Sequence, residues 1–130
     1  MSQASAAGVV GIHTVGIPVN DQDKAIDFYV GVLGLDRRID VPMGGDRRWI
    51  EVAPPGSATS LALVPATESD PTGKETGVRL VASDAEAAHR HLSGSAVDVG
   101  EILRWPGVPA MFAFRDMDGN GLEMIEVSGS

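Results

Sequence analysis

The chain has 130 residues, a formal net charge of −8 and no cysteine. This length is typical of one domain with its own core, and the missing thiols exclude disulfides and thiolate metal sites. An acidic chain whose ten Lys and Arg are scattered lacks the basic face that nucleic acids or anionic membranes require. No apolar run approaches the ~20 residues that cross a bilayer, and the first seven residues have no signal-peptide pattern, so we expect a cytoplasmic location.

The first half of the chain predicts a strand, a helix and three further strands. Alternating apolar residues at Val15, Ile17 and Val19 indicate the first strand. The helix is expected to be capped by Asn20 or Asp21 and ended by Gly34. Its apolar stripe comprises Ala25, Phe28, Tyr29, Val32 and Leu33. Strands are expected near residues 35–40, 47–53 and 60–65, and the polar residues 67–74 form a linker.

The second half repeats this order. Residues 78–84 align with residues 15–21, and residues 121–124 align with residues 60–63, which indicates one unit used twice. A capping box at Ser83 and Glu86 predicts the start of the second helix. Strands are expected near residues 97–103, 109–115 and 121–127. The chain is therefore predicted to be one α+β domain over residues 1–130, with βαβββ modules at about 8–66 and 75–127.

Alternation along the strands predicts a second sheet face that turns away from the helices. The apolar residues that alternate toward the helices include Ile50, Val52, Leu61, Leu63, Phe112, Phe114, Leu122 and Met124. The other face mixes apolar surface with charge and is typical of a concave small-molecule site. Trp105, in an Arg-Trp-Pro-Gly loop, is expected at its rim. The predicted ligand-binding residues are Thr14, Trp49, Glu51, Arg79, Trp105, Met111, Arg115 and Glu123. Alternatively, the four charged side chains of this face, Glu51, Arg79, Arg115 and Glu123, only pair with one another and do not contact a ligand.

Two stretches resemble the vicinal-oxygen-chelate superfamily, which includes glyoxalase I, bleomycin-resistance proteins and extradiol dioxygenases. One is HTVGIPVNDQDKAIDFYVGVLG, from His13 to Gly34, and the other is FRDMDGNGLEMIE, from Phe114 to Glu126. The resemblance implies paired βαβββ modules that form a cupped mixed sheet, the glyoxalase/bleomycin-resistance/dihydroxybiphenyl dioxygenase fold. It also implies a homodimer with the cups at its interface, and leaves open whether each cup is made within one chain or by swapped modules.

The same resemblance implies four metal-ligand positions, which fall on Thr14, Ala62, Gly77 and Glu123. Ala62 and Gly77 offer no ligand atom, whereas a catalytic zinc site typically has about three protein ligands. We therefore expect no metal and no cofactor. His13 lies one residue from the first position, and strand alternation turns it to the opposite face unless a bulge intervenes.

The favoured hypothesis is a metal-free binding protein of the antibiotic-resistance type. It would sequester an aromatic or partly anionic compound in a dimeric cup. The alternative is a glyoxalase-like lyase, isomerase or dioxygenase with a degenerate or metal-free site, in which Glu123 or Glu51 acts as general base. A third hypothesis, a dimer module without a ligand, fits the mixed face least well. The sequence leaves open both the ligand and whether any reaction occurs.

Overall fold

A computed structural model describes residues 6–127, so expectations about the extreme ends lie outside the described residues. The first half contains β1 (Thr14–Val19), α1 (Gln22–Ile26), its π-helical continuation η1 (Asp27–Val32), β2 (Asp36–Gly44), β3 (Arg47–Ala53) and β4 (Ser60–Pro65). The second half contains β5 (Glu75–Ala82), α2 (Ala85–Gly94), β6 (Leu103–Trp105), β7 (Val108–Arg115) and β8 (Gly121–Glu126). This order confirms the predicted α+β class with two βαβββ units.

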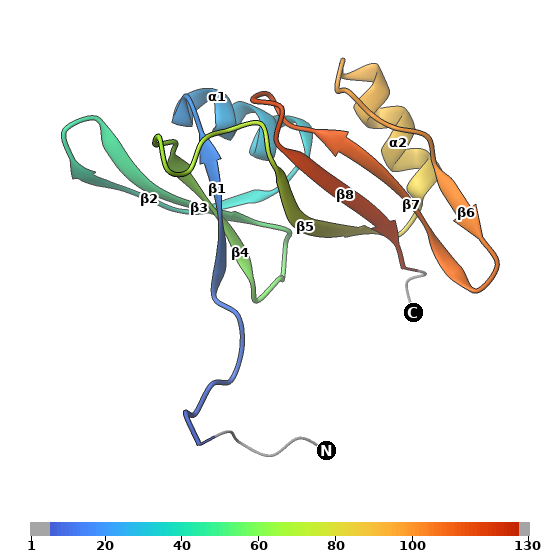
Figure 1. The fold of residues 1–130 in the computed structure, drawn as a ribbon, viewed down its shortest axis with the longest axis horizontal. Helices are drawn as coiled ribbons and strands as arrows, with labels where there is room; N and C mark the ends of the chain where they lie inside the picture. Colours follow the sequence, from blue (N-terminus) through green and yellow to red (C-terminus); the bar gives the residue numbers. More distant parts are fainter. Residues whose placement is uncertain (1–5, 128–130) are drawn as a thin grey trace.

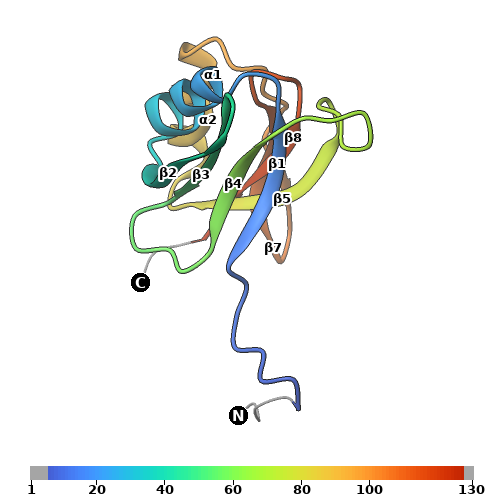
Figure 2. The same cartoon turned by 90° about the vertical axis from the view of Figure 1, so that its left-hand side faces the viewer.

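Each half forms a four-stranded mixed sheet, with strand orders β1-β4-β3-β2 and β5-β8-β7-β6. In each sheet the first and last strands of the unit pair in parallel, and the other neighbours are antiparallel. The internal repeat also appears in the strand register. Gly16 pairs with Ala62 in the first sheet, and the equivalent residues of the second half, Arg79 and Glu123, pair in the second sheet. Figures 1 and 2 show the sheets side by side, with β1 and β5 central and both helices on the same side.

The helices begin at aspartate caps. Asp21 accepts hydrogen bonds from the backbone N–H groups of residues 23 and 24, which confirms one of the two predicted caps. Asp84, in extended conformation, caps α2 by accepting from Ala87 N–H, so the predicted Ser83 cap is wrong. The expected capping-box partner, Glu86, binds Arg104 instead. Gly34 ends the first helix with φ at 80°, a left-handed conformation that glycine adopts without strain.

A single apolar core runs through both halves beneath the helices. The strand residues predicted to face the helices at positions 50, 52, 61, 63, 112, 114, 122 and 124 are all buried. Val15 is an exception at 36% exposure, because it borders a gap between the two sheets. None of the helices between residues 6 and 127 combines the length and hydropathy needed to cross a membrane.

The strand expected at residues 97–103 is mostly irregular. Only Leu103–Trp105 forms β6, and upstream of it Val99 makes a single bridge to Phe114. Gly100, which lies close against the main chain of Ala113, weakens strand formation there. Regular pairing is therefore limited to the residues beside the turn at Gly107, and Trp105 belongs to the strand rather than to a loop.

A buried turn between β7 and β8 locks the two halves together. Asp116 accepts a 2.6 Å hydrogen bond from the Tyr29 hydroxyl and a 3.0 Å bond from Asn120 Nδ2. Asn120 Nδ2 also donates to the Pro18 carbonyl at 2.8 Å, at the end of β1. Burial, followed by the charge of Asp116, raises the pKa of Tyr29. Because its buried groups are partnered, this network fixes the position of the second sheet against the first.

Candidate functional site

A polar cluster lies on the face of the first sheet that turns away from the helices. At its centre Glu51 of β3 is only 4% exposed. Its Oε1 accepts from the Ser60 hydroxyl at 2.8 Å, and its Oε2 accepts from Trp49 Nε1 at 2.8 Å. His13 Nε2 lies 3.3 Å from the same Oε2. The Ser60 hydroxyl also lies 2.8 Å from Thr14 Oγ1, which completes the Glu51 cluster of residues 13, 14, 49, 51 and 60.

The pleat of the sheet explains why these side chains meet. Trp49 and Glu51 are two residues apart on β3 and therefore share a face, as alternation predicts. Thr14 and Ser60 are direct partners in the parallel pair of β1 and β4. Ser60 alternates with Leu61 and so shares this face, but it is not among the predicted site residues, because a lone serine gives no signal of its own in the sequence.

The surroundings of Glu51 favour its ionised form. Burial by itself would raise the pKa of Glu51, but hydrogen bonds from Trp49 and Ser60 and the nearby His13 lower it below the usual 4.5. The side chain is therefore a carboxylate at neutral pH. A buried carboxylate held by three donors is a fixed negative charge and a weak proton acceptor.

His13 contradicts the expectation that it faces the opposite side of the sheet. It precedes the first residue of β1, so strand alternation does not determine its direction. Its carbonyl accepts from Ser60 N–H at 3.0 Å, and its ring turns to the side of Glu51 without a bulge in β1. The His13 side chain is 77% exposed, so it covers the cluster from the solvent side.

The charged side chains of the second sheet form two separate ion pairs. Arg79 Nε lies 2.8 Å from Glu123 Oε1, and the two residues are register partners. Arg115 pairs with Glu75 at 2.9 Å rather than with Glu123. Trp105 is exposed on β6, and Met111 is half-buried on β7. The alternative that the charged side chains only pair with one another therefore holds for Arg79 and Glu123. It does not hold for Glu51, whose closest donors, Trp49 and Ser60, are neutral.

Five of the eight predicted site residues fall into two separate groups, and Trp105, Met111 and Arg115 belong to neither. Among residues 6–127, none of the hydrogen bonds or ion pairs joins the Glu51 cluster to the Arg79–Glu123 pair. The four positions implied for a metal do not fit one, because Ala62 and Gly77 carry no ligand atom. Gly77 lies in a register shift of β5 with φ at 76°. In the described part of the chain no three His, Cys, Asp or Glu side chains gather closely enough to hold a metal ion.

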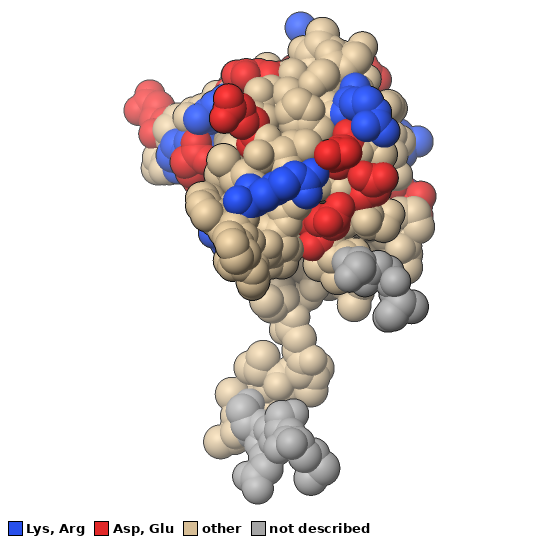
Figure 3. Space-filling view, turned by 90° about the vertical axis from the view of Figure 1, so that its right-hand side faces the viewer, with Lys and Arg blue, Asp and Glu red and all other residues tan. Residues whose placement is uncertain are grey.

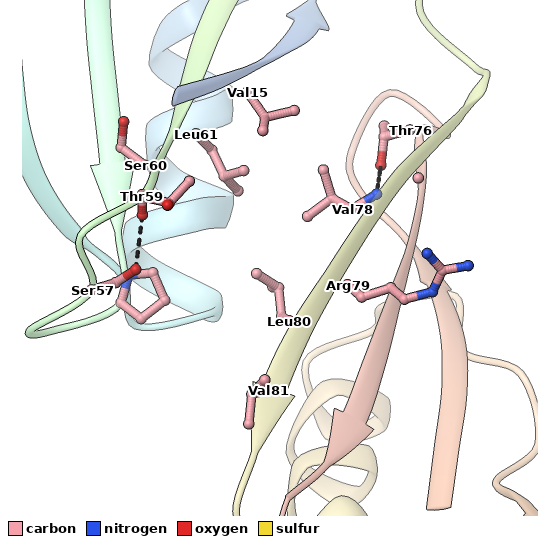
Figure 4. Close-up of a pocket in the computed structure, with 12 residues that line it drawn as sticks. Val15, Ser57, Thr59, Ser60, Leu61, Thr76, Val78, Arg79, Leu80 and Val81 are labelled. Atoms are coloured by element: carbon pink, nitrogen blue, oxygen red, sulfur yellow. Dashed lines mark hydrogen bonds between the residues drawn. The ribbon is translucent and has the colours of Figure 1, made fainter. Parts of the chain in front are cut away.

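A cavity of about 470 Å³ opens between the two sheets. Figure 4 shows the side chains of Val15, Leu61, Val78 and Leu80 pointing into it, whereas Arg79 points away. The apolar side chains that enter the cavity are those that alternate toward the helices, whereas Ser60 both lines the cavity and belongs to the Glu51 cluster. The volume of the cavity suits a small molecule, and the hydroxyl side chains of Ser57, Thr59, Ser60 and Thr76 also line it.

Charge on the surface is mixed. Figure 3 shows Lys and Arg side chains interspersed with Asp and Glu on the face that it presents, rather than gathered by sign. This distribution agrees with the scattered basic residues of the sequence, and it lacks the basic stripe typical of a nucleic-acid interface.

Comparison with known proteins agrees with this architecture. Residues 11–124 match the model of the Glyoxalase/Bleomycin resistance protein/Dioxygenase superfamily, and the chain belongs to that superfamily. The uncharacterized protein YetH of Bacillus subtilis is 31% identical over 113 residues, which cover 84% of this chain and 92% of YetH.

Two solved structures are similar over most of their length. TnmS3, an antibiotic binding protein from Streptomyces sp. CB03234, is 34% identical with a TM-score of 0.81, covering 91% of this chain and 96% of TnmS3. A superfamily member from Sphaerobacter thermophilus is 31% identical with a TM-score of 0.83, covering 92% and 98% of the two chains. These two structures support the fold and the superfamily.

Proposed function

We propose that this protein binds a small aromatic molecule on the concave face of its first sheet and sequesters it without a metal. The observation that carries the proposal is the Glu51 cluster, a buried carboxylate with neutral donors beside Trp49. Ile39 and Val41 of β2 pair with Glu51 and Trp49 and add apolar surface to the same face. Apolar walls with a few fixed polar groups are typical of ligand sites. The similarity to TnmS3, described as an antibiotic binding protein, supports this class of function.

The surroundings of Glu51 and Glu123, the two candidate general bases, support binding rather than catalysis. The pKa of Glu51 is lowered, because its donors outweigh the effect of burial, so it attracts protons weakly. Glu123 is engaged by Arg79 at 2.8 Å. A general base works best with a pKa near the operating pH, and the pKa of Glu51 is shifted away from neutrality.

A second copy of the chain is part of the proposal. The described residues of one chain leave the Glu51 cluster and the Arg79–Glu123 pair on separate, open sheets. A homodimer would place another sheet opposite each face and exclude water from the ligand. A cytoplasmic location, as expected from the sequence, also remains part of this proposal.

The test is a thermal-shift screen of aromatic compounds, followed by mass spectrometry of each hit. A ligand that binds only the folded state raises the melting temperature. We expect at least one aromatic hit, recovered chemically unchanged after long incubation. Conversion of a hit to product, abolished by Glu51→Gln or Glu123→Gln, would contradict sequestration and support the enzyme alternative.

A further inference from the structure

We propose that His13 and Glu51 form a proton-accepting dyad that captures an aromatic ligand by an acidic hydroxyl group and holds it as the anion. This inference rests on the proposed binding function and names its ligand class, a phenol or an enol conjugated to an aromatic ring. The dyad joins an exposed imidazole to a buried carboxylate, and Trp49 shares the same carboxylate oxygen.

The hydrogen bond between the two residues fixes the tautomer of His13. An ionised carboxylate can only accept hydrogen bonds, and Glu51 is ionised at neutral pH. The hydrogen between His13 Nε2 and Glu51 Oε2, 3.3 Å apart, therefore resides on Nε2. In that tautomer the lone pair of the imidazole is on Nδ1, which can accept a proton.

The acceptor nitrogen is open to a ligand. The His13 side chain is 77% exposed, whereas that of Glu51 is 5% exposed. Across residues 6–127 the structure gives Nδ1 no hydrogen-bond partner, and Glu51 is the charged group within ion-pair distance of the ring. A planar ligand with its hydroxyl at Nδ1 would lie near the indole of Trp49, which donates to the same Oε2. Aromatic pairs of this kind add affinity beyond burial.

The proton transfer balances without any other reactant. The ligand O–H bond breaks, its electron pair stays on oxygen, and an N–H bond forms at His13 Nδ1. The product is an imidazolium between two anions, the ligand oxygen and Glu51. Hydrogen bonds between such ions are stronger than those between neutral groups, so an acidic hydroxyl is preferred over an ether of the same shape.

The probes are 4-nitrophenol and its methyl ether, 4-nitroanisole. They are nearly identical in shape, only the phenol carries a proton, and its absorption spectrum changes when it ionises. Binding is measured at a pH below the pKa of the free phenol, by tryptophan fluorescence for affinity and by absorption for the ionised form. In the wild-type protein we expect bound 4-nitrophenol to show the spectrum of the anion and to bind about tenfold or more tightly than 4-nitroanisole.

The variant His13→Gln keeps a hydrogen-bonding side chain at an exposed position but cannot accept the proton. We expect it to remove both the anion spectrum and the preference for the phenol over 4-nitroanisole. Glu51→Gln should likewise remove the anion spectrum and the preference for the phenol, because it removes the charge that stabilises the imidazolium. If both probes bind equally and the phenol stays neutral, the dyad is wrong and the binding function stands. If neither probe binds, both proposals fail.

Discussion

At the scale of single residues, Glu51 is the group on which the site depends. Its carboxylate is buried, yet it retains its charge because Trp49, Ser60 and His13 surround it. Burying a charge is costly unless it is hydrogen-bonded, so these donors permit an anion on the sheet. By contrast, the Arg79–Glu123 pair is partly exposed, and such pairs contribute little to stability.

The lowered pKa of Glu51 predicts a specific loss of stability in acid. The folded-state pKa is below the usual 4.5, so the stabilisation is fully present above that value and is lost as the pH falls through the folded-state pKa. The measurement is urea unfolding of the wild type and of Glu51→Gln from pH 7 to pH 3. The difference in unfolding free energy between them should shrink below about pH 4.5. A difference independent of pH would show that the charge of Glu51 does not stabilise the fold.

At the scale of elements, the turn between β7 and β8 connects the halves through Tyr29 and Asp116. Tyr29→Phe removes one donor from a buried carboxylate and leaves the apolar packing of the ring intact. We expect the free energy of unfolding to fall by about 1–3 kcal/mol, measured by urea denaturation at neutral pH. A change near zero would mean that the remaining donors to Asp116, including Asn120, suffice by themselves.

Strand periodicity and the internal repeat were enough to predict the order of elements, the strand faces and the shared face of Trp49 and Glu51. Periodicity and the repeat did not predict features that depend on a single residue. Asp84, rather than Ser83, caps α2. The direction of His13 depends on chain that precedes β1, where alternation no longer applies. Long-range pairs such as Arg79 with Glu123 required the register, which spacing along the chain alone does not define.

At the scale of the whole molecule, exposed apolar side chains predict self-association. They lie on the N-terminal arm before β1 and along several strands, and include Val9, Val10, Ile12, Val41, Met43, Val81, Leu103, Trp105 and Val108. We expect a second copy of the chain to cover part of this apolar surface, because large exposed apolar patches mark association sites. Light scattering at micromolar concentration should give twice the 13.5 kDa chain mass. A mass of one chain would contradict the homodimer.

The central claim is that a small aromatic ligand binds beside Trp49 on the concave face of the first sheet. The chain has two tryptophans, Trp49 and Trp105, so each can be replaced in turn. The most direct measurement is a fluorescence titration of Trp105→Phe and Trp49→Phe with an aromatic hit from the thermal-shift screen. We predict saturable quenching in Trp105→Phe, in which Trp49 is the remaining emitter, and loss of most of that signal in Trp49→Phe. Equal quenching in Trp49→Phe, with none in Trp105→Phe, would place the ligand elsewhere and contradict the assigned site.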